Sequence, residues 1–192
     1  MLPAWTPDAT GYLVALFAIA SLEAVPLWGR WVPGHLGFAA VACVAVGFVG
    51  VSPWLLVAAW TGAFLSDLAF YAWYRVRPVR TLRRHGGWWR AGLDVDDLSE
   101  ALEHGPVGAF FAAKFSTRDR ARLAYAAGKA DLPPAAFVLL SAFACAVWTS
   151  AWIGLGGALG WLARNLPRAW AVALLAVAFV ALLASLSRPQ PA

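Results

Sequence analysis

The chain has 192 residues, of which 61% are hydrophobic and only 13% are charged, and 12 of them are tryptophan. Soluble domains carry about 25% charged residues, so this composition excludes an ordinary soluble domain and predicts an integral membrane protein. The net charge of +5 fits contact with anionic lipid headgroups, and because no groove-reading motif accompanies it, a nucleic-acid partner is not expected.

Apolar segments along the chain divide by length into spanning helices and short arms. A helix needs about 20 residues to cross roughly 30 Å of hydrocarbon, because each residue advances it by about 1.5 Å. Residues 54–74, 132–163 and 167–187 approach or exceed this length, and each segment predicts a transmembrane helix. Residues 36–50 and 105–113 are too short and predict arms that enter the membrane without crossing it.

The two short arms each precede a long helix that starts at a proline, which predicts an internal repeat. Fourteen residues after Pro53 lies Asp67, and fourteen residues after Pro134 lies Trp148. Paired interrupted segments are typical of transporters built from inverted repeats, whose site lies near the membrane midplane. The predicted fold is all-α: an inverted repeat of two re-entrant helical hairpins, each followed by a long transmembrane helix, with a C-terminal transmembrane helix after them.

The domain organisation follows from this repeat. A single membrane domain covers residues 1–192, with the first repeat at 10–74 and the second at 105–163. The linker at 75–104 opens with a run of arginines, which the positive-inside rule keeps in the cytoplasm, and closes with the amphipathic stretch "LDVDDLSEALEHG". Acidic residues at the start of that stretch suit the N-terminus of a helix, so a short surface helix is expected there.

The stretch "KFSTRDRARLAYAAG", residues 114–128, concentrates charge in an otherwise apolar chain. It holds Lys114, Arg118, Arg120 and Arg122, and each charge at the centre of a membrane costs about 2.5–3.5 kcal/mol. The stretch is therefore either an interfacial loop or the tip of a re-entrant hairpin that lines a polar cavity. On a helix, Arg118 and Arg122 share one face, which leaves Arg120 to point inward.

Glu23 and Asp67 are lone carboxylates inside apolar sequence, where a charge is costly unless it is paired or protonated. Either could form a buried salt bridge with Arg120 or Lys114 that holds two hairpins together. Either could instead exchange protons or a cationic ligand during transport. His35, in "WVPGHLG", could titrate near neutrality or serve as an interfacial histidine at a turn.

Signals for catalysis and for bound metals are missing from the sequence. Cys43 and Cys145 lie in apolar runs without metal-ligand or redox spacing, so we expect small buried side chains without a functional signal. No nucleophile elbow or phosphate-binding loop is present, and spacing suggests no base near Ser116 or Thr117. The sequence therefore predicts a protein that is not an enzyme and holds no metal ion or cofactor.

Three stretches together resemble a known family. "LEAVPLWGRWVPGHL" resembles the E-N-x-x-P … P-G-D/E opening of the DedA (VTT-domain, SNARE-associated) membrane proteins. "GAFLSDLAFYAWYR" resembles their G-A-x-x-G-D-x-x-x-Y-x-x-G-R, and the charged stretch resembles their R-F-x-P-x-x-R-x-x-x-x-x-x-A-G. The chain departs from these motifs where it has His35 for a carboxylate, Ser66 for a glycine, Lys114 for an arginine and Thr117 for a proline.

The resemblance implies a divergent DedA-like protein of the inner (plasma) membrane, multi-pass and able to form homo-oligomers. It implies movement of a phosphate-headgroup lipid, a phospholipid or undecaprenyl phosphate, between leaflets, by a flippase or scramblase linked to the proton gradient. It gives functional roles to Glu23, Asp67 and Arg120, with Lys114 at the second arginine position and His35 at the second acidic one. The four cations of the charged stretch would then bind the phosphate, and Glu23, Asp67 and His35 would serve proton coupling.

Two other functions stay open at this point. A proton-coupled transporter of small solutes or cations would use Glu23 and Asp67 for the coupling ion, and the basic tip would only gate. A non-transporting membrane scaffold would use the acid–base pairs only to join the hairpins.

Overall fold

A computed structural model describes residues 7–23, 34–49, 52–76, 95–116 and 119–165, and all regular structure within them is helical. The all-α class is therefore confirmed for this part of the chain. The elements are α1 (Pro7–Glu23), α2 (Gly34–Val49), α3 (Pro53–Val76), α6 (Asp96–His104), α7 (Pro106–Phe115), the 3-10 turn η1 (Arg120–Arg122), α8 (Leu123–Lys129) and α9 (Pro134–Asn165).

Prolines mark where several of these helices begin. Pro53, Pro106 and Pro134 are the first residues of α3, α7 and α9. At this position the missing N–H costs no intrahelical hydrogen bond, and the fixed φ of proline already suits a helix. The predicted helix starts at the two repeat prolines are thus confirmed.

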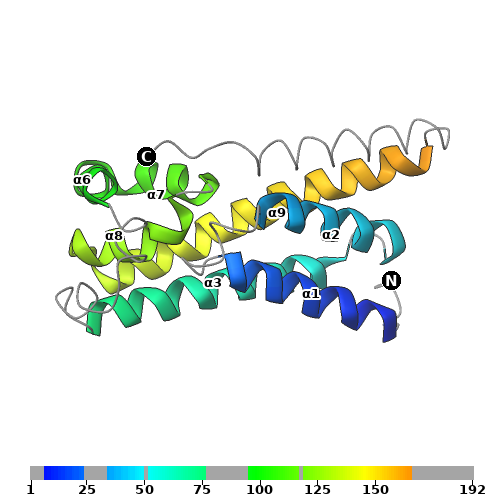
Figure 1. The fold of residues 1–192 in the computed structure, drawn as a ribbon, viewed down its shortest axis with the longest axis horizontal. Coiled ribbons are helices and arrows are strands. Elements are labelled where there is room, and N and C mark those ends of the chain that lie inside the picture. The colour runs from blue at the N-terminus through cyan, green and yellow to red at the C-terminus, as the bar shows by residue number, and fades with distance from the viewer. Residues whose placement is uncertain (1–6, 24–33, 50–51, 77–94, 117–118, 166–192) are drawn as a thin grey trace, which may run out of the picture.

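Two helices are long and apolar enough to cross a membrane, by length and composition: Pro53–Val76 with 24 residues and Pro134–Leu162 with 29. They match the spans predicted at 54–74 and 132–163. Figure 1 shows α3 and α9 running in opposite directions along the length of the molecule, and the two helices contact each other. The third predicted span, 167–187, lies outside the described residues.

The remaining helices divide between the two ends of this pair. In Figure 1, α1 and α2 lie along one half of the long helices, and α6, α7 and α8 lie along the other. At the first end, α1 packs on α3 and α2 packs on α9; at the second, α8 packs on α3 and α7 packs on α9. The helix that directly precedes each long helix in the chain therefore packs on the other long helix.

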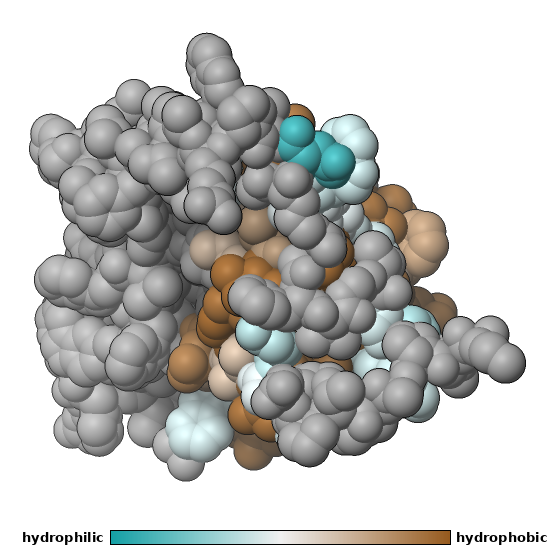
Figure 2. Space-filling view, turned by 90° about the vertical axis from the view of Figure 1, so that its right-hand side faces the viewer, coloured by the Kyte–Doolittle hydropathy of each residue, from teal (hydrophilic) through white to brown (hydrophobic). Residues whose placement is uncertain are grey.

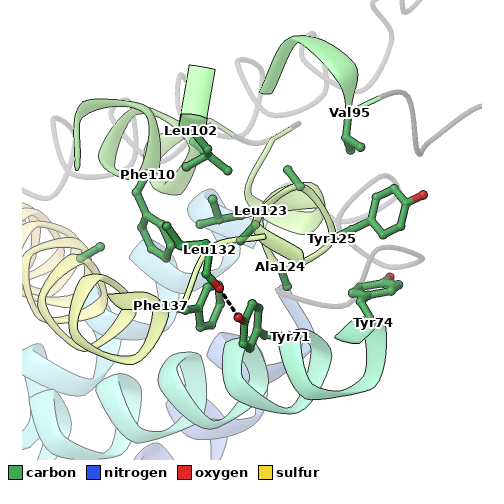
Figure 3. Packing of buried hydrophobic residues seen from close by; sticks show 14 residues of the cluster. Tyr71, Tyr74, Val95, Leu102, Phe110, Leu123, Ala124, Tyr125, Leu132 and Phe137 are labelled. Carbon is green, nitrogen blue, oxygen red and sulfur yellow. Dashed lines mark hydrogen bonds between the residues drawn. The ribbon is translucent and has the colours of Figure 1, made fainter. Parts of the chain in front are cut away.

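Each end has its own apolar core. One cluster joins α1, α2, α3 and α9 and includes Phe38 and Trp148. The other joins α6, α7 and α8 to the opposite parts of α3 and α9 and includes Tyr71, Phe110 and Phe137. Figure 3 shows this second cluster, in which Tyr71 and Phe137 stack with ring centroids 4.0 Å apart and the Tyr71 hydroxyl donates to the Leu132 carbonyl. The two cores hold the hairpin helices against the long pair.

Glycines allow the long helices to approach their neighbours closely. A Cβ atom at Gly62 would lie 2.4 Å from the Phe17 carbonyl oxygen in α1. On α9, a Cβ at Gly156 would lie 2.9 Å from the Cys43 nitrogen, and one at Gly160 would lie 2.9 Å from the Cys43 oxygen. Small residues at such contacts are typical of helix packing in membranes, because they let the backbones come together.

The outer surface of the described helices is also apolar. Leu139, Phe143 and Trp161 of α9 are 71%, 64% and 63% exposed. Figure 2 shows apolar residues reaching the surface at the end of the molecule that lies on the right of Figure 1. Large exposed apolar surfaces indicate contact with a partner or a membrane, and helices surrounded by lipid have this character.

The predicted surface helix is confirmed as α6, which covers Asp96–His104 of the amphipathic stretch. Its first turn carries Asp96 and Asp97, and it buries Ser99 and Leu102 toward its neighbours. Asp96 forms an exposed ion pair with Lys129 of α8. This helix therefore caps the end of the molecule where α7 and α8 lie.

Candidate functional site: a buried acid–base cluster

Asp67 is the centre of a buried polar cluster between the long helices. It lies in α3 with 5% of its surface exposed. Its Oδ2 atom accepts hydrogen bonds from the Ser141 hydroxyl at 2.7 Å and from the Cys145 thiol at 3.4 Å, both on α9. The Lys114 ammonium, in the last turn of α7, forms an ion pair with the same oxygen. One carboxylate thus joins α3, α7 and α9.

Lys114 is fully buried, which is rare for a lysine and requires a compensating charge. The short helix α7 buries Phe110 and Ala113 together with Lys114, so the same face that forms the core delivers the ammonium to the interior. Removing one partner of such a pair costs about 3–5 kcal/mol, because the other charge is left buried and uncompensated. The structure thus pairs Asp67 with Lys114, one of the two cations predicted as its salt-bridge partner.

Arg120 approaches the same stretch of α9 from η1. It is 3% exposed, and its guanidinium carbon lies 3.8 Å from the centroid of the Trp148 ring. A guanidinium over an indole face is attracted by the ring quadrupole, by about 2 kcal/mol or more where water is excluded. Trp148 also packs against Phe38 of α2, with ring centroids 4.9 Å apart. Trp148 thus lies between the basic turn and the first hairpin.

The cluster lies where the two apolar cores meet. Asp67 follows Ala63, a member of one core, by one helical turn, and precedes Tyr71, a member of the other, by one turn. On α9, Cys145 and Trp148 are three residues apart and therefore on neighbouring turns of one face. The Asp67 cluster and the Arg120–Trp148 pair therefore occupy adjacent positions near the middle of the long helices.

The structure brings some of the predicted site residues together, whereas the side chains of others lie outside the described residues. Asp67, Lys114 and Arg120 are all buried, and each contacts the Cys145–Trp148 region of α9 or the carboxylate beside it. Arg120 is buried, as predicted. Arg122, at the end of η1, is half-buried. Glu23 is the last residue of α1 and His35 is the second residue of α2, but the side chains of both lie outside the described residues. Arg118 lies outside them entirely.

The helical geometry assumed for the charged stretch is wrong. α7 ends at Phe115, and Ser116 is extended with φ −83° and ψ 126°. The Asp119 backbone N–H donates to the Ser116 hydroxyl at 3.2 Å, and the Arg120 backbone N–H donates to the Ser116 carbonyl at 3.1 Å. Because α7 ends at Phe115 and Arg120–Arg122 form a 3-10 turn, the stretch is not one α-helix. The predicted face shared by Arg118 and Arg122 includes a residue outside the described part of the chain.

Ser141 and Cys145 are site residues that the sequence analysis missed. Cys145 is buried, as predicted, and its thiol contacts Asp67, a contact that the sequence did not predict. The available signal was the spacing of Ser141, Cys145 and Thr149, which lie four residues apart on one face of an apolar helix.

A comparison with protein families identifies the family to which the chain belongs. The family model described as the VTT domain matches residues 32–158, which is more than half of the chain and includes the whole acid–base cluster. This chain belongs to the VTT-domain family. No curated protein and no solved structure matches the chain.

Membership of the VTT-domain family confirms the resemblance that the sequence motifs predicted. The matched range begins in front of α2 and ends inside α9, so it contains Asp67, Lys114, Arg120 and Trp148 but not Glu23. VTT-domain proteins are membrane-associated, and together with the two long apolar helices this makes the chain a membrane protein.

Proposed function

We propose that this VTT-domain protein moves a lipid with a phosphate headgroup between the leaflets of the inner (plasma) membrane, as a flippase or scramblase. The observation that supports this most is the burial of two cations, Lys114 and Arg120, beside Asp67 near the middle of the long helices. Buried ionisable groups inside a membrane are costly, and in such proteins they typically mark a pathway for substrates or ions.

The chemistry of the two cations suits a phosphate. Arg120 can offer two parallel N–H donors to phosphate oxygens, and Trp148 holds its guanidinium plane. Lys114 is a point charge on a flexible stem, so it can turn from Asp67 to an entering headgroup. Asp67 would balance the charge of Lys114 while no lipid is bound. During transport, the phosphate of the lipid would replace Asp67 as the partner of Lys114.

The arrangement of the helices supports the proposed inverted repeat. α2 and α8 each precede a long helix and pack on the opposite long helix, while α1 and α7 occupy the complementary positions. Two re-entrant hairpins related in this way would approach the site from opposite ends of the long pair (Figure 1). Such a repeat can open to one leaflet and then to the other around a fixed site.

Proton coupling is a further part of the proposal. Asp67, together with Glu23 and His35, would take up or release protons when Lys114 leaves for the phosphate. A carboxylate inside a membrane that alternates between a paired and an unpaired state is a natural proton carrier. Glu23 and His35 enter this proposal through the family motif alone.

The test is reconstitution into vesicles that contain a fluorescent phospholipid or polyprenyl phosphate, read by a leaflet-accessibility assay. Arg120→Ala should slow lipid movement at least about tenfold, because charge-assisted hydrogen bonds contribute about 1.5–3 kcal/mol each. The control is Lys129→Ala, which removes an exposed cation that pairs with Asp96 on the surface. Equal rates for the two variants would contradict a phosphate site at Arg120.

A scaffold remains a second candidate, because the Asp67–Lys114 pair joins α3 to α7 and would stabilise the fold without any transport. A transporter of small solutes is distinguished by its cargo. It would move ions or solutes across lipid-only vesicles and leave the distribution of fluorescent lipid between leaflets unchanged.

A further inference from the structure

Asp67 receives more hydrogen bonds than its ion pair requires. The Lys114 ammonium already supplies a full opposite charge to the Oδ2 atom. The Ser141 hydroxyl and the Cys145 thiol, both from buried positions on α9, donate to the same oxygen. In an apolar helix these two polar side chains are not needed to fill space, because alanine or valine would do so.

Thr149 shows what a buried polar side chain on this face does when it has no partner outside the helix. Its hydroxyl donates to the Cys145 carbonyl, four residues earlier, at 2.8 Å. This local bond is the usual solution for serine and threonine in a helix interior. Ser141 lies two turns away on the same face, yet its hydroxyl reaches across to Asp67 at 2.7 Å. The donor of Ser141 is therefore directed at the carboxylate.

We propose that Ser141 and Cys145 are positioning residues that hold the Asp67 carboxylate in place while Lys114 leaves it for a lipid phosphate, before the carboxylate takes up a proton. This inference rests on the proposed function and assigns to α9 a role within it. If Lys114 alone held the carboxylate, its departure would leave a buried charge without compensation, and the exchange would be strongly opposed. Two remaining donors lower that barrier, because hydrogen bonds to a charged form favour it.

Transport rates of variants test this role. Ser141→Ala should slow lipid movement by about tenfold, because it removes a hydrogen bond to a charged group. Cys145→Val should have a smaller effect, because a thiol is a weak donor, and Cys145→Ser should retain wild-type transport. The double variant S141A/C145V should lose more than either single one. Thr149→Val is the matched control on the same face, and it should transport within about twofold of wild type because it loses only a local bond.

A second measurement reports the contact itself and needs no transport. The S–H stretching band in the infrared spectrum moves to lower frequency when the thiol donates a hydrogen bond. In a Cys43→Ala background, Cys145 is the only cysteine, and its band should move to higher frequency when Asp67 is replaced by Ala. Thr149→Val in the same background should leave the band where it was.

The outcomes separate this inference from the proposed function. If Arg120→Ala abolishes lipid movement but the double variant S141A/C145V transports like Thr149→Val, the positioning role is wrong and the phosphate site stands. An S–H band that ignores Asp67→Ala also overturns the inference. If no variant, Arg120→Ala included, alters lipid movement, the proposed function fails, and the infrared shift still shows whether Cys145 donates to Asp67.

Discussion

Trp148 forms a cation–π contact with the buried guanidinium of Arg120, with 3.8 Å between the guanidinium carbon and the ring centroid. A guanidinium held this way is fixed in plane, because the ring contacts its face. Trp148 also contacts Phe38 of α2, so one side chain links the basic turn to the opposite hairpin. The residue that orients Arg120 is therefore also the residue that couples it to α2.

Trp148→Leu should weaken both contacts. We expect a loss of about 2 kcal/mol of the interaction with Arg120, and a corresponding drop in lipid movement of roughly 30-fold. Trp148→Phe should retain part of the activity, since a smaller aromatic face remains. The measurement is the leaflet-accessibility assay, with Trp161→Leu as the control because Trp161 lies on the same helix but is 63% exposed. Wild-type transport in Trp148→Leu would contradict the orienting role.

The Asp67–Lys114 pair allows stability to be separated from transport. Lys114→Met alone should destabilise the protein by about 3–5 kcal/mol, because Asp67 is left as a buried unpaired charge. The double variant D67L/K114M should recover most of that loss, since apolar replacements of a buried pair are often neutral. Thermal unfolding in detergent gives the stability, and vesicles give the transport. A scaffold predicts that the stable double variant keeps its function, whereas our proposal predicts that it does not.

At the scale of elements, some boundaries could be predicted and others could not. Pro53 and Pro134 indicated the starts of α3 and α9, because proline is favoured in the first turn and excluded later. α7 ends at Phe115, close to the end of the arm predicted at 105–113, whereas the bonds between Ser116 and Asp119 were not predicted, because they are local and leave no periodic pattern. Ser141 was missed because a serine in an apolar helix usually bonds its own backbone.

The contact between α2 and α9 depends on glycine. A Cβ at Gly156 would lie 2.7 Å from the Ala42 Cβ, so Gly156→Ala must push the helices apart and should cost about 1–3 kcal/mol. Gly154→Ala is the matched control, since nothing lies within 4 Å of a Cβ there. Gly154→Ala should leave the protein as stable or raise its stability by up to about 1 kcal/mol, because alanine favours helix. Equal unfolding temperatures for the two variants would contradict close packing at this contact.

At the scale of the molecule, the charged cluster joins α3, α7 and α9, Arg120 of η1 contacts α9 on the neighbouring turn, and both apolar cores include residues beside it. Sequence alone could indicate Asp67 and Lys114 as costly charges, and the fourteen-residue register placed Asp67 and Trp148 at corresponding positions. It could not pair Asp67 with Lys114 rather than Arg120, because that choice depends on where α7 ends.

The end of the molecule that holds α6, α7 and α8 should lie on one side of the membrane. Arg75, at the end of α3, donates to the Tyr71 hydroxyl at 2.6 Å and to the Leu132 carbonyl at 3.3 Å, which ties α3 to the start of α9. The Lys129–Asp96 pair ties α8 to α6 in the same region. The arginine-rich linker would place this end in the cytoplasm.

Cysteine labelling tests this topology in a protein without its native cysteines. Single cysteines at Glu103 and Asp131, both exposed, should react with a membrane-impermeant maleimide from the same, cytoplasmic side. A cysteine at Asn165, at the far end of α9, should react from the opposite side, because α9 is long enough to cross. If Glu103 and Asp131 react from opposite sides, the segment between them crosses the membrane completely. In that case α7 and α8 do not form a re-entrant hairpin, and Lys114 and Arg120 belong to a segment that spans the membrane.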